Sequence, residues 1–167
     1  MKILVLSDTH IPVAAQDLPE AIYKAIEGVD MIFHAGDLID AGVLEKLKSL
    51  KETRAVRGNM DSKELCMTLN TKEVINIGRF KIGLVHGYGA PSEIMPTVRR
   101  EFDKIDVLVF GHSHAAMNIK KEGVLYFNPG SPTDKIFASK NSYGILEVTD
   151  KKVEGTIVEL WAQNEKG

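Results

Sequence analysis

The first third of the chain alternates continuous apolar runs with amphipathic segments. Residues 3–6 and 31–33 are unbroken apolar runs, the pattern of strands that are buried on both faces. Apolar residues recur at helical spacing over residues 18–26 and again over residues 43–50, and residues 53–56 form a third strand-like run. This order of strand, helix, strand, helix, strand predicts a parallel sheet with helices over its faces.

The second half of the chain is richer in strand-like patterns. Residues 73–77 and 80–85 flank Gly78-Arg79 and predict a hairpin, and one apolar face over residues 94–102 predicts a helix. Further strand-like runs follow at residues 107–110, 117–120, 124–128, 143–148 and 153–160. With no linker or repeat visible, we expect one α/β domain over residues 1–167.

Composition narrows the class of protein without naming a function. The chain has 21 basic and 23 acidic residues, a net charge of -2, and no basic stripe that would bind a nucleic-acid duplex. Cys66 is the only cysteine, so an intrachain disulfide is excluded. No apolar run approaches the roughly 18–20 residues of a membrane span. We therefore expect a cytoplasmic protein with no membrane contact, and the sequence is compatible with a homodimer without predicting one.

Polar motifs directly follow five of the predicted strands. They are Asp8-Thr9-His10, Gly36-Asp37, Gly58-Asn59-Met60-Asp61, His86-Gly87 and Gly111-His112-Ser113-His114. Because ligands bind outside the carboxyl ends of the strands in an open α/β sheet, these side chains are expected at one rim. Imidazole and carboxylate groups are ligands of Zn, Mn, Fe and Ni. The pattern therefore predicts a metal centre.

Each motif taken alone has an ordinary structural explanation. Asp8 and His10 could form a strand-end turn, and Asp37 could cap the helix that follows it. Asn59 could be a turn residue in the left-handed conformation, and His86 could be a hydrogen-bonded core histidine. The occurrence of all five motifs at strand ends is what favours metal ligation.

The order of these motifs resembles that of the metallophosphoesterase (calcineurin-like phosphoesterase) superfamily. The similarity is greatest to its small, cap-less prokaryotic phosphodiesterases, and it runs from Met1 to about Leu160. The loop Asn128-Pro129-Gly130-Ser131 is typical of this branch. The resemblance implies a four-layer α/β/β/α sandwich, in which two mixed sheets lie face to face with helices outside.

The resemblance also implies roles for seven residues. Asp8, His10 and His114 would bind a first metal ion, Asp37 would bridge both ions, and Asn59, His86 and His112 would bind the second. We expect Asp37, Asn59 and His86 to be the catalytic residues among them. Two ions roughly 3.5–4 Å apart need a bridging anion, which a carboxylate provides and an imidazole does not.

The function expected from this centre is phosphodiester hydrolysis. A hydroxide that bridges two divalent transition-metal ions would attack the phosphorus of a small phosphodiester, such as a cyclic nucleotide. Mn is the first expectation for the metal, and Ni, Fe, Zn and Co suit the same ligands. The alternatives are a phosphomonoesterase and a non-catalytic metal-binding scaffold, like the smallest retromer subunit. The complete ligand set favours an enzyme.

One position departs from the pattern of the larger phosphatases of the superfamily. There the Gly-Asn pair is followed by a histidine, whereas this chain has Met60, which cannot donate a proton to a leaving group. We expect Asp61 to form a turn or to support a ligand. His34 is expected to be structural or to orient a ligand. Arg57 is expected to hold phosphate, to be solvated or to support the sheet.

Overall fold

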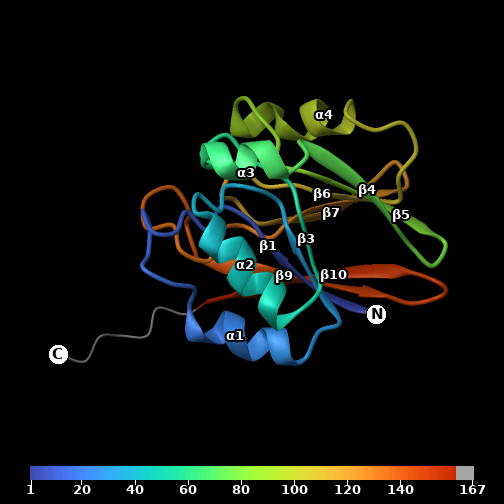
Figure 1. Cartoon of the computed structure of the whole chain (residues 1–167). Coiled ribbons are helices and arrows are strands. Elements are labelled where there is room, and N and C mark those ends of the chain that lie inside the picture. The colour runs from blue at the N-terminus through green and yellow to red at the C-terminus, as the bar shows by residue number, and fades with distance from the viewer. Residues whose placement is uncertain (161–167) are drawn as a thin grey trace.

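The computed structural model describes residues 1–160, so the last seven residues of the predicted domain lie outside the described range. Two five-stranded sheets lie face to face, with helices on the outside of the molecule (Figure 1). Both sheets contain parallel and antiparallel neighbours. The predicted four-layer sandwich of two mixed sheets is therefore confirmed.

The first sheet is built around the amino-terminal strand. Its strands are ordered β10-β9-β1-β2-β3, and their bounds are Lys2–Leu6 (β1), Met31–His34 (β2), Thr53–Ala55 (β3), Ser142–Val148 (β9) and Val153–Glu159 (β10). The neighbours β1, β2 and β3 are parallel, as the alternating pattern predicted. Strand β9 extends the sheet on the other side of β1 in the antiparallel sense.

The second sheet comes from the middle of the chain. Its order is β4-β5-β6-β8-β7, with bounds Lys72–Ile77 (β4), Phe80–Val85 (β5), Val107–Val109 (β6), Met117–Lys121 (β7) and Val124–Asn128 (β8). The predicted hairpin is β4 and β5, which pair along their whole length. Strands β5, β6 and β8 are parallel neighbours, so their carboxyl ends point the same way.

The helices cover only the outer face of each sheet. Helices α1 (Glu20–Glu27) and α2 (Ala41–Leu50) pack on the first sheet through a buried cluster that includes Ile22, Leu44 and Leu47. A helix that the sequence pattern did not predict, α3 (Lys63–Thr68), adds Leu65 to this cluster. Helix α4 (Ile94–Arg99) covers the second sheet. The prediction of helices over both faces of the first sheet was wrong, because its inner face packs against the second sheet.

The core between the sheets explains why the strand sequences read as continuous apolar runs. Ile3, Val5 and Phe33 of the first sheet pack against Ile82 and other residues of the second sheet. Alternate residues of the same strands, such as Leu4 and Ile32, point outward into the helix-facing cluster. Because both faces of these strands are buried, neither face can be polar.

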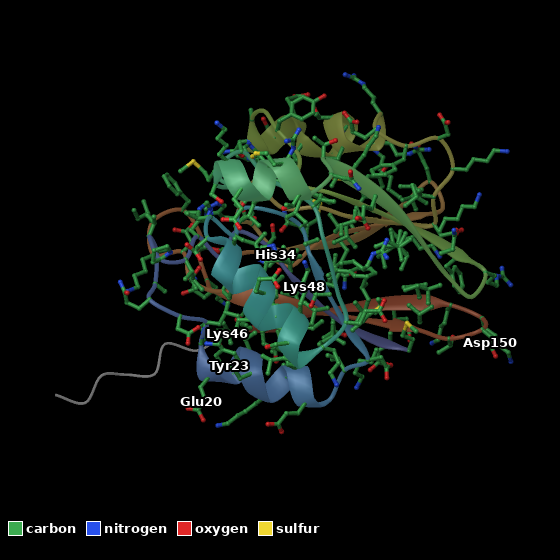
Figure 2. All side chains as sticks on the ribbon, viewed as in Figure 1. Glu20, Tyr23, His34, Lys46, Lys48 and Asp150 are labelled. Atoms are coloured by element: carbon green, nitrogen blue, oxygen red, sulfur yellow. The ribbon has the colours of Figure 1, made fainter. Side chains whose placement is uncertain are left out.

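Helices α1 and α2 are also joined at the surface. The phenol of Tyr23 donates to Asp17, whose carboxylate also accepts from Lys46 at 2.6 Å. The Lys46 ammonium lies 4.7 Å from the centroid of the Tyr23 ring, and the two side chains lie beside one another in Figure 2. All three groups are solvent-accessible, so this network joins the two helices but adds little to the free energy of unfolding. None of the helices described here is long and apolar enough to cross a membrane.

Candidate metal centre

The predicted ligands converge where the strands of both sheets end. The first sheet supplies Asp8, His10, Asp37 and Asn59 from the loops after β1, β2 and β3, and the second supplies His86, His112 and His114 from the loops after β5 and β6. Two groups of side chains place their ligand-type atoms within 4.8 Å of one another. One group is Asp8, His10 and His114, and the other is Asp8, Asp37 and His86.

The backbone at this rim is strained. Seven non-glycine residues of the described chain have positive φ, and five of them are predicted ligands. They are Asp8, His10, Asp37, His112 and His114, with φ between 45° and 68°. A non-glycine residue in the left-handed region is uncommon and costs on the order of 1 kcal/mol or more. Such strain concentrates at functional sites, which supports a shared role for these residues.

Asp8 carries an oxygen that has no partner within the described residues. Its side chain is fully buried, and Oδ2 accepts from the Ser7 hydroxyl at 2.6 Å and from the His112 backbone N–H at 3.0 Å. Its Oδ1 is buried without a hydrogen bond and lies 3.4 Å from His114 Nε2. Leaving a buried carboxylate oxygen unsatisfied is costly. A cation bound at Oδ1 would remove this cost, so the site fits a metal ion.

Three histidines are oriented through the ring nitrogen that faces away from the cluster. His86 Nδ1 bonds the Ala35 carbonyl at 2.7 Å, and His112 Nε2 bonds the Gly89 carbonyl at 3.0 Å. His114 Nδ1 bonds the Asp134 carboxylate. Since a carbonyl or carboxylate can only accept, these nitrogens carry the proton. In the neutral form of each ring, the other nitrogen then presents a lone pair toward the cluster, the usual arrangement for a metal-ligating histidine.

Asp37 and Asn59 lie between the histidines. Asp37 Oδ2 is 3.6 Å from His10 Nε2 and 3.4 Å from His86 Nε2, so one oxygen faces both groups. Asn59 Oδ1 is 3.1 Å from both His86 Nε2 and His112 Nδ1. The oxygens of Asp37 and Asn59 that could bind a metal ion therefore lie close to the ring nitrogens of the neighbouring histidines.

The loops that carry Asp37 and Asn59 are held by a third residue, Asp61. Its carboxylate accepts from the backbone N–H groups of Asp37 at 3.1 Å, of Ile39 at 2.7 Å and of Gly58 at 2.7 Å. The sequence suggested either a turn or a supporting role for Asp61, and the geometry combines both. Gly58 is required here, because a Cβ at this position would lie 2.1 Å from Asp37 Oδ1.

Burial and charge act in opposite directions on the pKa values of this cluster. Burial alone would lower the pKa of His114, but bonds and charge from Asp8 and Asp134 outweigh it and raise the pKa to about 9. Burial would raise the pKa of Asp134, yet His114 and backbone N–H groups bring it down to about 2. Without a cation, His114 therefore carries a proton at neutral pH and bonds the Asp134 carboxylate, with Asp8 Oδ1 at 3.4 Å.

Asp134 was not predicted as a site residue, although the Asn128–Ser131 loop that precedes it was singled out from the sequence. Asp134 is buried beside His114, yet lies 20 residues beyond it in the chain. The Asn128–Ser131 loop flanks the site, because the Asn128 amide donates to the Gly111 carbonyl and the Ser131 hydroxyl to the Asp8 carbonyl.

His34 and Arg57 support the site from outside. His34 is fully buried, bonds the Thr9 hydroxyl at 3.1 Å and accepts from the Gly36 N–H at 3.2 Å. Burial lowers its pKa to about 4, so it is neutral and structural. The Arg57 guanidinium donates to the Cys66 carbonyl within α3. Arg57 is thus tied to a helix and not to the sheet.

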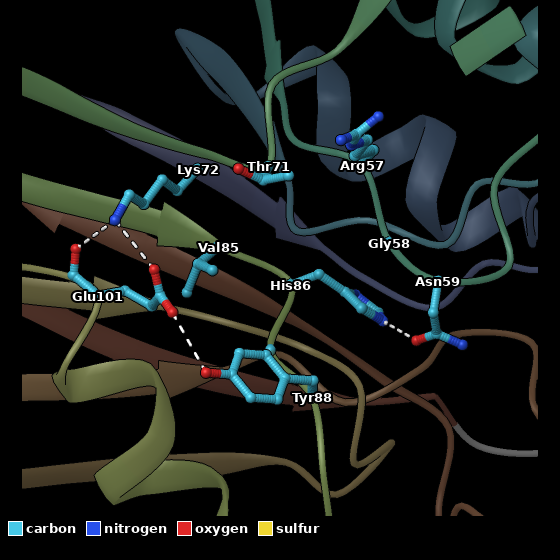
Figure 3. Close-up of a pocket in the computed structure, with 10 residues that line it drawn as sticks. Arg57, Gly58, Asn59, Thr71, Lys72, Val85, His86, Tyr88 and Glu101 are labelled. Carbon is cyan, nitrogen blue, oxygen red and sulfur yellow. Dashed lines mark hydrogen bonds and ion pairs between the residues drawn. The ribbon is translucent and has the colours of Figure 1, made fainter. Parts of the chain in front are cut away.

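A polar pocket of about 360 Å³ lies beside Asn59 and His86. Figure 3 shows Lys72, Glu101 and Tyr88 along one wall, with Arg57 on the opposite side. The Lys72 ammonium lies 2.9 Å from the Glu101 carboxylate, which the Tyr88 hydroxyl also approaches. The charges of this wall are thus largely paired with one another.

The arrangement has a counterpart among known protein families. Residues 1–151 match the family model for the calcineurin-like phosphoesterase superfamily domain. The chain belongs to this superfamily. As a calcineurin-like phosphoesterase it is expected to hydrolyse phosphoesters with divalent metal ions, and the convergent carboxylates and imidazoles are the residues available to bind them.

Relatives and solved structures agree with this assignment. The calcineurin-like phosphoesterase chain is 34% identical over 164 residues to a probable metallophosphoesterase of Methanothermobacter thermautotrophicus, covering 97% of this chain and 94% of that one. It is 38% identical over 136 residues to a probable metallophosphoesterase of Methanocaldococcus jannaschii, covering 80% and 69%. The crystal structure of Chaetomium thermophilum Vps29 superposes with a TM-score of 0.84 at 25% identity, covering 98% and 89%.

Proton competition at His114 leads to a first prediction. A metal ion that binds His114 must displace the proton that this residue carries below its pKa of about 9. The apparent affinity for Zn²⁺ or Mn²⁺ should therefore rise by up to about tenfold per pH unit between pH 7 and pH 9. Isothermal titration calorimetry in buffers of different ionisation enthalpy would measure both affinity and proton release. An affinity that is independent of pH, with no proton release, would contradict the proposed ligation by His114.

Proposed function

We propose that the protein is a dinuclear metal-dependent phosphodiesterase. The observation that carries the proposal is the position of Asp37, whose Oδ2 faces His10 at 3.6 Å and His86 at 3.4 Å. These two histidines belong to the two different ligand sets. A carboxylate between two ligand sets is the arrangement that a pair of metal ions requires.

The ligand sets would be shared between both sheets. Asp8, His10 and His114 would hold one ion, Asn59, His86 and His112 the other, and Asp37 both. The unpaired Oδ1 of Asp8 and the outward-bonded rings of His86, His112 and His114 support this assignment. A set of oxygen and imidazole nitrogen donors suits Mn, the first choice, and also Ni, Fe, Zn or Co.

The protein's contribution would be to orient the reacting groups. Divalent ions bound there supply an activated water as nucleophile and neutralise charge on the phosphoryl oxygens. Asp37 is held by Asp61 through its backbone and by the Met60 N–H, which donates to Asp37 Oδ1 at 2.7 Å. The rings of His86 and His112 are held by backbone carbonyls. The donor atoms are therefore positioned before substrate binds.

The residues near the cluster favour a diester over a monoester. Met60, next to Asn59, cannot protonate a leaving group, so substrates with acidic leaving groups would react best. Met60 helps to line a cavity beside the cluster, and Lys135 is the only lysine or arginine among the described residues that line it. A monoester dianion would find little additional positive charge there, whereas a diester carries a single negative charge. We propose a small phosphodiester as the substrate.

Hydrolysis of bis(p-nitrophenyl) phosphate, beside the monoester p-nitrophenyl phosphate, tests this proposal. The protein would be stripped with a chelator and reloaded with Mn²⁺, Ni²⁺, Zn²⁺ or Mg²⁺, and its metal content measured. We expect two ions per chain and metal-dependent release of p-nitrophenol, faster from the diester than from the monoester. Equal or faster cleavage of the monoester would contradict diester specificity. One ion per chain at saturation would contradict the dinuclear site.

A scaffold role is the alternative that the fold comparison supports. The C. thermophilum protein carries the name Vps29, which does not refer to hydrolysis, and it superposes over nearly the whole chain. Failure of the metal-loaded protein to cleave either ester, with both ions bound, would favour this alternative.

A further inference from the structure

A second cavity also borders the cluster and shares Asn59 with the polar pocket. It has a volume of about 560 Å³ and is lined by His10, Asp37, Asn59, His112 and His114 of the predicted ligand set. The remaining wall is mainly apolar and includes Val13, Met60, Ile136 and Phe137. These four side chains are 75%, 54%, 81% and 78% exposed. Large apolar side chains clustered at a surface indicate a binding site.

The apolar wall is fixed to the cluster by Asp134. The carboxylate that bonds His114 Nδ1 also accepts from the backbone N–H groups of Ile136 at 2.8 Å, of Phe137 at 3.1 Å and of Ala138 at 2.8 Å. The Phe137 ring stands edge-on to the His114 ring, with centroids 5.9 Å apart. The same group thus positions a predicted metal ligand and the segment that carries two exposed apolar side chains.

The two flanks of the cluster therefore differ in chemistry. The polar pocket presents Lys72, Glu101 and Arg57, whereas the wall of the second cavity offers methyl, thioether and aromatic surface. Met60 lines the apolar wall and directly follows Asn59, which lines both cavities. A methionine adapts to irregular apolar partners and makes favourable contacts with aromatic rings.

We propose that this cavity, formed by Val13, Met60, Ile136 and Phe137 beside the cluster, binds an apolar ester group of the phosphodiester substrate. The inference rests on the proposed function and adds a substrate class to it: diesters with at least one aryl or alkyl group large enough to cover these side chains. Met60 contributes an apolar contact to the substrate in this role. Burial of about 60 Å² of apolar surface corresponds to roughly a tenfold gain in affinity.

Competitive inhibition separates the apolar contact from metal binding. Diphenyl phosphate, dicyclohexyl phosphate and dimethyl phosphate carry the same charge and differ in their ester groups. We expect the inhibition constant of diphenyl or dicyclohexyl phosphate against bis(p-nitrophenyl) phosphate hydrolysis to be about tenfold lower than that of dimethyl phosphate. Comparison of the diphenyl and dicyclohexyl compounds tells an aryl substrate from an alkyl one.

Two variants and a matched control locate the contact. In Met60→Ser and Phe137→Ser the ratio of inhibition constants should fall toward one, because each substitution removes apolar surface from the wall. Met67→Ser serves as the control, since Met67 is an exposed methionine, at 78%, that does not line the cavity. Equal inhibition by all three diesters, or a ratio unchanged in both wall variants, would overturn the proposal.

A binding measurement keeps the proposal testable if the protein cleaves no diester. In Zn²⁺-loaded protein labelled at the methionine methyl groups, diphenyl phosphate should shift the NMR signal of Met60 through the ring current of its phenyl groups. Dimethyl phosphate should leave that signal almost unchanged, and Met60→Ser would assign it. A shifted Met60 signal without hydrolysis would support the cavity and count against the proposed function. An unshifted signal during active hydrolysis would overturn the cavity and leave the function standing.

Discussion

Replacing Asp37 by asparagine should lower kcat of metal-dependent hydrolysis by about a thousandfold while the fold remains intact. Loss of the bridging charge would remove several kcal/mol of transition-state stabilisation, and each 1.36 kcal/mol is a factor of ten. Asparagine keeps the oxygen that accepts from the Met60 N–H at 2.7 Å. It also tolerates the left-handed backbone of this position, where φ is 59°. The expected defect is therefore chemical and not structural.

The matched control for this variant is Asp40→Asn. Asp40 caps helix α2 through its side chain, which accepts from the Gly42 N–H at 2.7 Å, and asparagine caps helices equally well. Steady-state kinetics, metal analysis and circular dichroism would be compared across both variants and the parent protein. Full activity in Asp37→Asn with two ions bound would refute the bridging role.

Replacing Asp134 by alanine should reduce metal affinity or activity by about 10- to 100-fold, the effect typical of losing the hydrogen-bond partner of a ligating histidine. The substitution removes the group that bonds His114 Nδ1 and three backbone N–H groups of the following segment. Asp134→Asn should lose less, because its amide oxygen can still accept from His114. The pKa of His114 in metal-free protein should fall below about 9 in both variants, since Asp134 helps to raise it.

NMR titration of His114 and circular dichroism together distinguish a local effect from general destabilisation. Loosening of the fold would also move the pKa of this histidine toward its ordinary value of 6.5, so the circular dichroism spectrum should be unchanged in Asp134→Ala. Asp150→Ala, at the exposed turn between β9 and β10 (Figure 2), is the control for loss of an acidic residue. Unchanged metal affinity and an unchanged His114 pKa in Asp134→Ala would contradict the assigned role.

The strands could be predicted where the sequence carries a strong physical signal. Buried strands such as β1 and β6 read as apolar runs because both of their faces are covered. Helix α3 was missed because only Leu65 of its six residues is buried, which leaves no apolar stripe. The helix predicted over residues 94–102 ends at Arg99, whose guanidinium donates to the carbonyls of Phe102 and Asp103. Such a local interaction leaves no periodic trace in the sequence.

The residues of the site could be predicted from the sequence in part. The seven proposed ligands follow strands, and strand ends in α/β sheets meet at one rim, so their convergence was foreseeable. Asp134 lies in an irregular segment after β8, and nothing in its immediate sequence links it to His114. The apolar wall was equally hidden, because Val13 and Phe137 are far apart in sequence and show no periodicity.

The left-handed backbone of five predicted ligands has a consequence for how such a protein changes over evolutionary time. Glycine would relieve the backbone strain at each of these positions, because it adopts positive φ without steric cost. The strained aspartates and histidines therefore persist only while selection maintains their chemistry. Once that selection is relaxed in a descendant, mutation toward unstrained residues is favoured by thermal stability alone. The rim that carries the predicted ligands is in this sense the part of the sandwich most free to change in sequence, while the two sheets beneath it can be retained for other uses.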